Sequence, residues 1–437
     1  MHLSNPKFFA INFAYNSKLA VIIIRVYFWL LSFLISSKAS LKYKFGIIES
    51  ANSFPICSPN STVIFLNIEA ILYFILLLSM IFKKNKIKLK KKKESILHNI
   101  YLQNLGCEKN TVDGEHILSI VKNKGYNIID NPEEADIIII NTCAFIEDSK
   151  KESIDSIFEH SIYKKYGKCK RLIVSGCMSE RYKENFLEMF KEVDSAIGIH
   201  NLDNILDAIE KDGFHDANEN ILYKEYSGRI NTGSLHSAYI RISDGCHANC
   251  SFCAIPKIRG RHRSRKIEDI DAEVKNYAQD GVKEINLIAQ ETTYYGYDLY
   301  NKLALPDLLE SLSKINGIEW IRVLYQNPVI LTDKIIESFF KIDKVLPYFD
   351  IPMQHVDKNI LKDMNRGGRG YKFYRNMIDK IRGFDDNAVI RSSFIVGFPG
   401  ETAESFKKLL KFIRNAKIDR VGVFAYSEED GTDALTL

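Results

Sequence analysis

The stretch "ADIIIINTC" at residues 135–143 decides the fold of the first half of the chain. It is a short apolar run that ends in polar residues and a cysteine, which is typical of a strand buried on both faces of a sheet. Similar strands lie before and after it, "HNIYLQNLG" at 98–106 and "KRLIVSGCM" at 170–178. The segments between them, "TVDGEHILSIVKNKGY" at 111–126 and "KKESIDSIFEHSIYKKY" at 150–166, have helical periodicity and predict helices.

This alternation of strand and helix predicts an α/β domain with a parallel, Rossmann or flavodoxin-like sheet. Parallel strands end at one edge of the sheet, where the ligands of such folds bind. Three of the strand ends carry a cysteine, namely Cys107, Cys143 and Cys177. Because these ends converge in space, the pattern favours a metal or iron–sulfur site. The alternative is three unrelated buried thiols, since free cysteine is among the most buried residue types.

Residues 212–233 break this periodicity and are predicted to link a domain of residues 98–211 to a second domain of residues 234–437. The second domain contains six further predicted strands separated by helical stretches, at 237–246, 283–290, 318–325, 348–354, 388–398 and 420–426. This order predicts a full or partial (β/α) barrel of the TIM type, whose chemistry lies at the carboxyl ends of the strands. The residues at such ends are Cys246, Gln290, His355 and Gly397.

The loop "ISDGCHANCSFCAIPKIRGRHRSR" at 242–265 contains Cys246, Cys250 and Cys253 in C-x3-C-x2-C spacing. Three thiolates on one loop can hold three irons of a 4Fe-4S cubane, whose ligands are ordinarily four cysteines; the fourth iron is then open to a substrate or cofactor. A structural zinc site is disfavoured because it needs a fourth protein ligand, and His247 lies too close in sequence. A ferredoxin-type electron carrier is disfavoured because it needs a fourth cysteine.

With Phe252 just before its last cysteine, this motif resembles the signature of the radical S-adenosylmethionine (SAM) enzymes. The resemblance implies that the open iron binds the amino and carboxylate groups of SAM, and that electron transfer cleaves SAM to a 5'-deoxyadenosyl radical. The segment "SSFIVGFPGET" at 392–402 resembles the glycine-containing cofactor-binding segment of these enzymes, in which Gly397 and Gly400 let the backbone approach the ligand. An ordinary turn between strand and helix is the alternative for this segment.

A cysteine-bearing α/β domain joined to such a barrel is similar to the methylthiotransferases of that superfamily. This resemblance implies that Cys107, Cys143 and Cys177 hold an auxiliary 4Fe-4S cluster, which carries the sulfur to be inserted and methylated. The stretches that resemble the RimO type of methylthiotransferase are "LGCEKNTVDGE", "NTCAFIEDSKKESID", "CAIPKIRGRHRSR", "IAQETTYYG" and "PYFDIPMQH". The resemblance covers residues 98 to 437.

The RimO type implies methylthiolation of the β-carbon of an aspartate in small-subunit ribosomal protein S-twelve, in the cytoplasm, with an electron donor such as flavodoxin or ferredoxin. One alternative is a tRNA adenosine 2-methylthiotransferase (MiaB-like). The other is a truncated, non-catalytic iron–sulfur protein. This second alternative draws support from the absence of a C-terminal TRAM β-barrel. The family pattern places that barrel after the stretch "FAYSEEDGTDALTL", which ends this sequence.

Residues 1–95 differ from the family pattern. Two apolar stretches, 19–36 and 62–82, approach the length of a membrane span, although Arg25 interrupts the first and Asn67 and Glu69 interrupt the second. A membrane hairpin with the following lysine-rich run on the cytoplasmic side is one interpretation. Translated upstream sequence, with the protein starting at Met80, is the favoured one.

The composition adds two exclusions. The chain of 437 residues has a formal net charge of +5, much of which comes from the run at 83–93, so bulk charge gives no indication of nucleic-acid binding. Its 8 cysteines are too sparse for a disulfide scaffold, and Cys57 and Cys169 match no ligand position.

His355 faces the cofactor or, more commonly for such a residue, is a hydrogen-bonded structural histidine. Four arginines after the cysteine loop either order the mouth of the active site or form a solvated face, namely Arg259, Arg261, Arg263 and Arg265.

Overall fold

The computed structural model describes residues 98–200, 202–216 and 228–437. The two apolar stretches at 19–36 and 62–82, Met80 and Cys57 lie outside the described residues. Within the described part of the chain, no helix is both long enough and apolar enough to cross a membrane.

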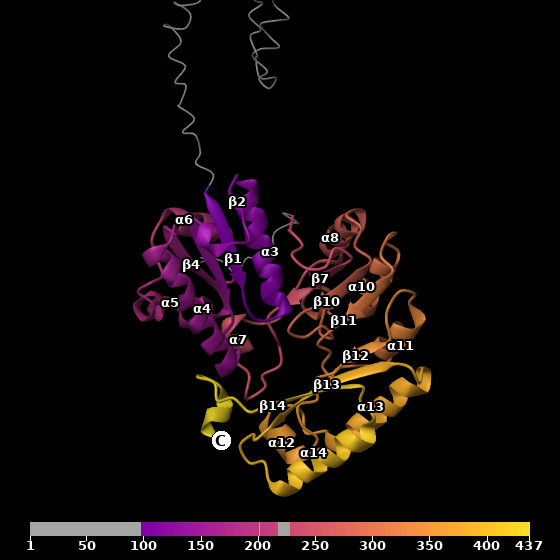
Figure 1. The fold of residues 1–437 in the computed structure, drawn as a ribbon. Coiled ribbons are helices and arrows are strands. Elements are labelled where there is room, and N and C mark those ends of the chain that lie inside the picture. The colour runs from indigo at the N-terminus through magenta and orange to yellow at the C-terminus, as the bar shows by residue number, and fades with distance from the viewer. Residues whose placement is uncertain (1–97, 201, 217–227) are drawn as a thin grey trace, which may run out of the picture. The chain divides into compact units, whose positions relative to one another are not determined.

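The first domain is built on a parallel sheet of six strands, in the order β2-β1-β3-β4-β5-β6 (Figure 1). Its strands are β1 (Asn99–Asn104), β2 (Asn127–Ile128), β3 (Ile137–Thr142), β4 (Arg171–Gly176), β5 (Ser195–Ile197) and β6 (Gly213–His215). Every residue of β3 is buried. Ile138 and Ile140 join the core on one face, while Ile137 and Ile139 join the core on the other. The predicted parallel sheet with a doubly buried central strand is therefore confirmed.

Helices cover both faces of this sheet, as Figure 1 shows for α3 and α4. Ile117 of α3 and Ile205 of α6 pack into one core, and Ile157 of α4 and Phe186 of α5 pack into the other. The helices are α3 (Glu108–Asn123), α4 (Glu147–Tyr166), α5 (Cys177–Met189) and α6 (Ile205–Glu210), with the 3-10 turns η1 (Pro132–Glu134) and η2 (Leu202–Asn204). Both predicted helices begin three residues before the predicted start, so that they start directly behind the cysteine-bearing turns.

The segment predicted to be a linker contains ordered structure at both ends. Its first residues form the edge strand β6, which pairs with β5 and was missed because three half-buried residues leave little hydrophobic pattern. At its other end, the buried Arg229 donates to the hydroxyl of Tyr277 at 2.6 Å and lies 3.2 Å from Glu115. This part of the predicted linker therefore fastens α3 to the second domain.

The second domain is a partial (β/α) barrel, as predicted. Two parallel three-stranded sheets, β7-β10-β11 and β12-β13-β14, meet where Ile321 bridges to Val345. The strands are β7 (Ser237–Arg241), β10 (Glu284–Ile288), β11 (Trp320–Val323), β12 (Tyr348–Asp350), β13 (Val389–Val396) and β14 (Arg420–Ala425). Each lies inside one of the six predicted segments.

The barrel helices carry apolar residues at helical spacing toward a single core. In α14, for example, Leu409, Phe412 and Ala416 are buried, and Thr402 caps the helix by accepting from the N–H of Ser405. The helices are α7 (Ile255–Ile258), α8 (Ile267–Gln279), α9 (Tyr297–Tyr300), α10 (Leu305–Ser313), α11 (Asp333–Lys341), α12 (Lys358–Asp363), α13 (Gly370–Phe384) and α14 (Ala403–Ala416), followed by the 3-10 turn η3 (Asp433–Thr436).

A buried ion network joins the two domains. Asp113 of α3 accepts from Arg241 at the end of β7 at 2.7 Å and from Arg259 at 2.9 Å. The side chains of all three residues are at most 2% exposed. Ile258 of α7 packs into the core beneath the first sheet. The barrel segment that follows the cysteine loop is therefore anchored in the first domain.

We expect Asp113→Ala to lower the free energy of unfolding of the cluster-free protein by about 3 kcal/mol or more, because it leaves two buried guanidinium groups without this carboxylate. Urea denaturation measures the change. Asp207→Ala is the matched control, since Asp207 pairs with Lys211 on the surface, and it is expected to cost no more than about 1 kcal/mol. Equal losses in the two variants would show that the network does not hold the domains together.

Candidate functional site

Three cysteines gather at the carboxyl edge of the first sheet. Cys107 follows β1 and precedes the first residue of α3, Cys143 follows β3, and Cys177 begins α5 directly after β4. Strands β1, β3 and β4 are neighbours in the sheet, so the three turns lie side by side. Burial raises the pKa of Cys177 to about 12; Arg259 acts to lower this pKa, and the thiolates of Cys143 and Cys107 raise it further. The order of the strands therefore brings the three cysteine-bearing turns to one edge of the sheet.

Gly106 makes this close approach possible. Its φ is +89°, and a Cβ at this position would lie 2.6 Å from the Cβ and 3.0 Å from the Sγ of Cys143. A side chain here would both strain the backbone and push Cys107 away from Cys143. The sequence "LGC" therefore has a geometric reason for its glycine.

The loop of Cys246, Cys250 and Cys253 is closed at its base by the antiparallel strands β8 (Ser243–Asp244) and β9 (Arg263–Ser264). Gly245 precedes the first cysteine with φ +74°, and a Cβ on it would meet the carbonyl oxygen of Arg261 at 2.3 Å. Burial raises the pKa of Cys246 to about 12 and that of Cys253 higher still, and the neighbouring Cys250 thiolate adds to both shifts. The structure therefore brings this second triplet together as well.

Two residues beside this loop were not found by sequence reasoning. The thiol of Cys246 points to Glu291 Oε2 at 3.9 Å, and burial raises the pKa of that carboxyl group. Arg366 donates to Cys250 Sγ at 3.7 Å and to the carbonyl of Pro352 at 2.7 Å. Glu291 directly follows Gln290 at a strand end, which is a usable signal; Arg366 lies in a loop between α12 and α13, and nothing in its local sequence marks it.

Among the residues predicted to bind SAM, Phe252 contacts the segment that contains Gly397 and Gly400. The ring of Phe252 meets the ring of Phe398 edge-on, with centroids 6.4 Å apart, and Phe398 lies between Gly397 and Gly400. Both glycines have positive φ, and no atom lies within 4 Å of a Cβ built on Gly397. The loop of the second triplet therefore contacts the segment that the sequence predicts for SAM.

His355 is connected to this glycine segment through hydrogen bonds. It is fully buried and its Nδ1 accepts from the N–H of Asp357 at 3.0 Å, so its Nε2 carries the proton and donates to Glu401 at 3.1 Å. Glu401 in turn accepts from the backbone N–H of Gly397. His355 is thus a hydrogen-bonded structural residue that orients the turn.

The arginines after the cysteine loop do not act as one group. Arg259 is buried, and its NH2 donates to Asn110 at 2.9 Å and to Cys177 Sγ at 3.4 Å in addition to Asp113. Arg265 is also buried and pairs with Glu273 at 2.6 Å, whereas Arg261 is exposed. Arg259 is therefore a physical link between the loop of the second triplet and a cysteine of the first.

The chemistry of the two triplets fits iron–sulfur clusters, whose ordinary ligands are cysteine thiolates. Within the described ranges, no group of three or more His, Cys, Asp or Glu side chains is placed to hold one metal ion. Each thiolate of a cubane binds a different iron, so its ligands surround the cluster instead of meeting at a point. Iron binding converts the thiols to thiolates. Arg259 beside Cys177 and Arg366 beside Cys250 supply positive charge next to the two groups.

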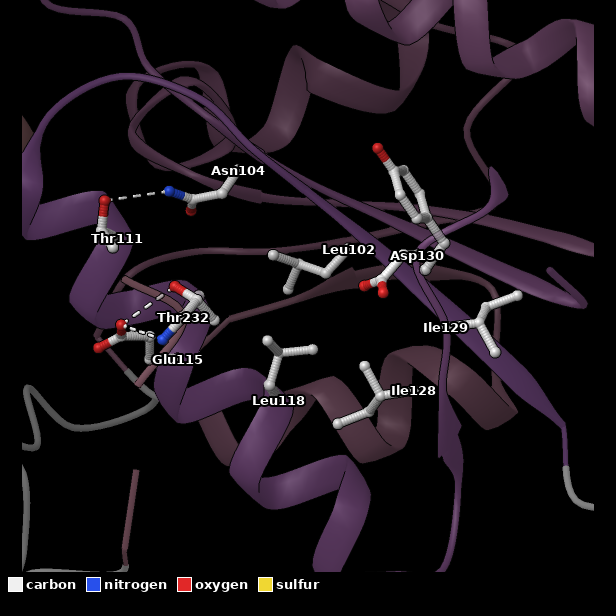
Figure 2. A pocket seen from close by; sticks show the side chains of 11 residues that line it. Leu102, Asn104, Thr111, Glu115, Leu118, Ile128, Ile129, Asp130 and Thr232 are labelled. Carbon is white, nitrogen blue, oxygen red and sulfur yellow. Dashed lines mark hydrogen bonds between the residues drawn. The ribbon is translucent and has the colours of Figure 1, made fainter. Parts of the chain in front are cut away.

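A cavity of about 220 Å³ lies elsewhere, between β1 and α3. Figure 2 shows Leu102, Leu118 and Ile128 facing into it, with Glu115 bonded to Thr232 at one end. None of the cysteines lines it. It therefore does not belong to the candidate site.

Comparison with known proteins covers both domains. Residues 99–198 match the uncharacterized protein family UPF0004, and residues 240–413 match the radical SAM superfamily. The ribosomal protein uS12 methylthiotransferase RimO of Clostridium tetani is 47% identical over 340 residues, which are 76% of this chain and 76% of that protein. The enzyme with the same description from Aquifex aeolicus is 48% identical over 333 residues, or 76% of this chain and 73% of that protein.

The fold as a whole resembles a solved radical SAM enzyme. The structure of the radical S-adenosylmethionine methyltransferase TsrM from Kitasatospora setae, with cobalamin and a [4Fe-4S] cluster bound, aligns with a TM-score of 0.56. The alignment covers 76% of this chain and 75% of that one at 13% sequence identity. At this identity the likeness concerns the arrangement of the domains' elements alone.

Proposed function

The chain belongs to the RimO family of radical SAM methylthiotransferases, and from this premise we propose that it adds a methylthio group to the β-carbon of an aspartate in ribosomal protein uS12. It is an enzyme of the transferase class that uses SAM and 4Fe-4S clusters. The substrate, the aspartate and the assignment of individual residues are the parts that we propose.

We assign one task to each cysteine triplet. Cys246, Cys250 and Cys253 hold the cluster that binds SAM, with Phe252, Gly397 and Gly400 lining the SAM site. The auxiliary cluster is held by Cys107, Cys143 and Cys177. When bound, the first cluster and SAM would supply the radical chemistry that removes a hydrogen atom from the β-carbon, and the auxiliary cluster would supply the sulfur. A second SAM would supply the methyl group, and flavodoxin or ferredoxin the electrons.

The observation that carries this assignment is the convergence of Cys107, Cys143 and Cys177 on the edge of one sheet, while the other triplet lies on the barrel loop. An enzyme that only cleaved SAM would need the loop triplet alone. Arg259 supports this proposal, because it follows the loop of the second triplet and donates to Cys177 Sγ at 3.4 Å. This contact ties the barrel loop to a cysteine of the first triplet.

For the substrate, we favour uS12 because both relatives named above carry that activity in their descriptions. The remaining candidate is a tRNA adenosine, the substrate of MiaB-like methylthiotransferases. We expect the enzyme to modify uS12 in the cytoplasm. No nucleic-acid contact is needed for this reaction.

The test is an anaerobic reaction of the reconstituted enzyme with SAM and a reductant, run separately on uS12 and on unmodified tRNA. We expect the mass of uS12 to increase by one methylthio group in place of one hydrogen, and the digested tRNA to contain no new 2-methylthioadenosine nucleoside. Modified tRNA beside unchanged uS12 would replace the proposed substrate with the alternative one.

A further inference from the structure

Lys109 is a buried lysine with unused hydrogen-bond donors. Its side chain is 7% exposed, and its Nζ lies 3.2 Å from the centroid of the Tyr325 ring. The nearest carboxylate is that of Glu108, whose Oε2 is 3.9 Å from Nζ and so beyond hydrogen-bond distance. Among the described residues, no hydrogen bond from the Lys109 ammonium is found. Nζ is not among the fully buried side-chain atoms of the described residues that lack a partner, so this ammonium keeps a small contact with solvent and its donors are accessible to a ligand.

The groups around Lys109 are, in contrast, paired with one another. The hydroxyl of Tyr325 donates to Glu108 Oε2 at 2.7 Å, and its backbone N–H donates to Asp350 at 3.1 Å. Arg391 donates to the other oxygen of Asp350 at 2.9 Å. The carboxylates of this group are therefore engaged, and the unused donors belong to Lys109.

The position of Lys109 connects the two halves of the proposed site. It lies two residues after Cys107 in the first domain, while Tyr325 and Asp350 lie at the carboxyl ends of the barrel strands β11 and β12. Substrates of such barrels bind at these strand ends. Tyr325 also has φ +59°, a left-handed conformation that is unusual for an aromatic residue. The ammonium thus lies where a substrate must meet both domains.

We propose that Lys109 binds the side-chain carboxylate of the aspartate that the enzyme modifies. This inference rests on the proposed function, because it needs an aspartate as substrate. The carboxylate carbon is bonded directly to the β-carbon, so a lysine that holds the first also positions the second. An ammonium binds a carboxylate through strong charge-assisted hydrogen bonds. An adenine base offers no such anion.

The test compares two substrate peptides by equilibrium binding, without turnover. Fluorescence anisotropy gives the dissociation constants of a labelled uS12 peptide with the target aspartate and of the same peptide with asparagine, for the reconstituted enzyme without reductant. We expect the wild-type enzyme to bind the aspartate peptide about 10- to 100-fold more tightly, as a hydrogen bond between charged groups implies. Lys109→Met should remove this preference, and Lys109→Arg should retain part of it.

Lys122→Met is the matched control, because Lys122 lies on the exposed surface of the same helix, and it should keep the full preference. The iron content is measured for every variant; if Lys109→Met loses iron, the same comparison is made on Lys109→Gln. An unchanged preference in the lysine variant, or none in the wild-type enzyme, would overturn the inference even if uS12 is modified. Modification of tRNA instead of uS12 would reject the proposed function itself.

Discussion

The variant in which Cys246, Cys250 and Cys253 are all replaced by alanine is expected to lose reductive cleavage of SAM to background level and to retain about half of the iron. Two cubanes hold about eight irons, and removal of one triplet leaves about four. The cleavage is lost because the variant lacks all three thiolates that we assign to the SAM site. In the described part of the chain, the side chains bonded to Cys246 and Cys250 are those of Glu291 and Arg366, which are not thiolates. Iron analysis and quantification of 5'-deoxyadenosine measure the two effects.

The control for this variant is Cys169→Ala. Cys169 is a buried thiol of the same chain, whereas Cys246, Cys250 and Cys253 are half-buried. Its thiol donates to the carbonyl of Arg171 at 3.2 Å and belongs to neither triplet. It should keep full iron content and full cleavage. If the triple variant retained all of its iron, the loop would not be the ligand set of a cluster.

The variant in which Cys107, Cys143 and Cys177 are replaced by alanine is expected to separate the two halves of the reaction. The triplet to which we assign SAM cleavage lies on the barrel loop, so formation of 5'-deoxyadenosine should remain measurable. Methylthiolated uS12 should fall below detection, because the variant lacks the cysteines to which we assign the sulfur-carrying cluster. The iron content should again fall to about half.

A chemical readout distinguishes this result from general unfolding. The circular dichroism spectrum and the retained cleavage of SAM report that the barrel is intact. Continued formation of the methylthio product in a variant without its second cluster would show that the sulfur does not come from the site at the sheet edge.

Much of the fold could be predicted because its strands are apolar runs with a consistent period. The burial of β3 on both faces and the six barrel strands follow from local sequence. The gathering of Cys107, Cys143 and Cys177 was also predictable, since adjacent parallel strands must end on the same edge. Short elements such as β6 were missed because three half-exposed residues carry no clear pattern.

The charged surroundings of the site could not be predicted, because they depend on contacts between distant segments. Arg259 lies 82 residues from Cys177 in sequence and Arg366 lies 116 residues from Cys250, yet each donates to that thiol. In the sequence, Arg259 is one of four similar arginines, and only packing separates it from the exposed Arg261. Lys109 is likewise marked as unusual only by its burial against Tyr325 from the other domain.

The most direct measurement follows the hydrogen atom of the substrate. A uS12 peptide whose target aspartate carries deuterium at both β positions is incubated anaerobically with the enzyme, SAM and a reductant, and the 5'-deoxyadenosine is analysed by mass spectrometry. Our account predicts that deuterium appears in the 5'-deoxyadenosine as the methylthio product forms, because the radical removes a hydrogen atom from that carbon. A methylthiolated peptide formed together with 5'-deoxyadenosine that contains no deuterium would contradict it.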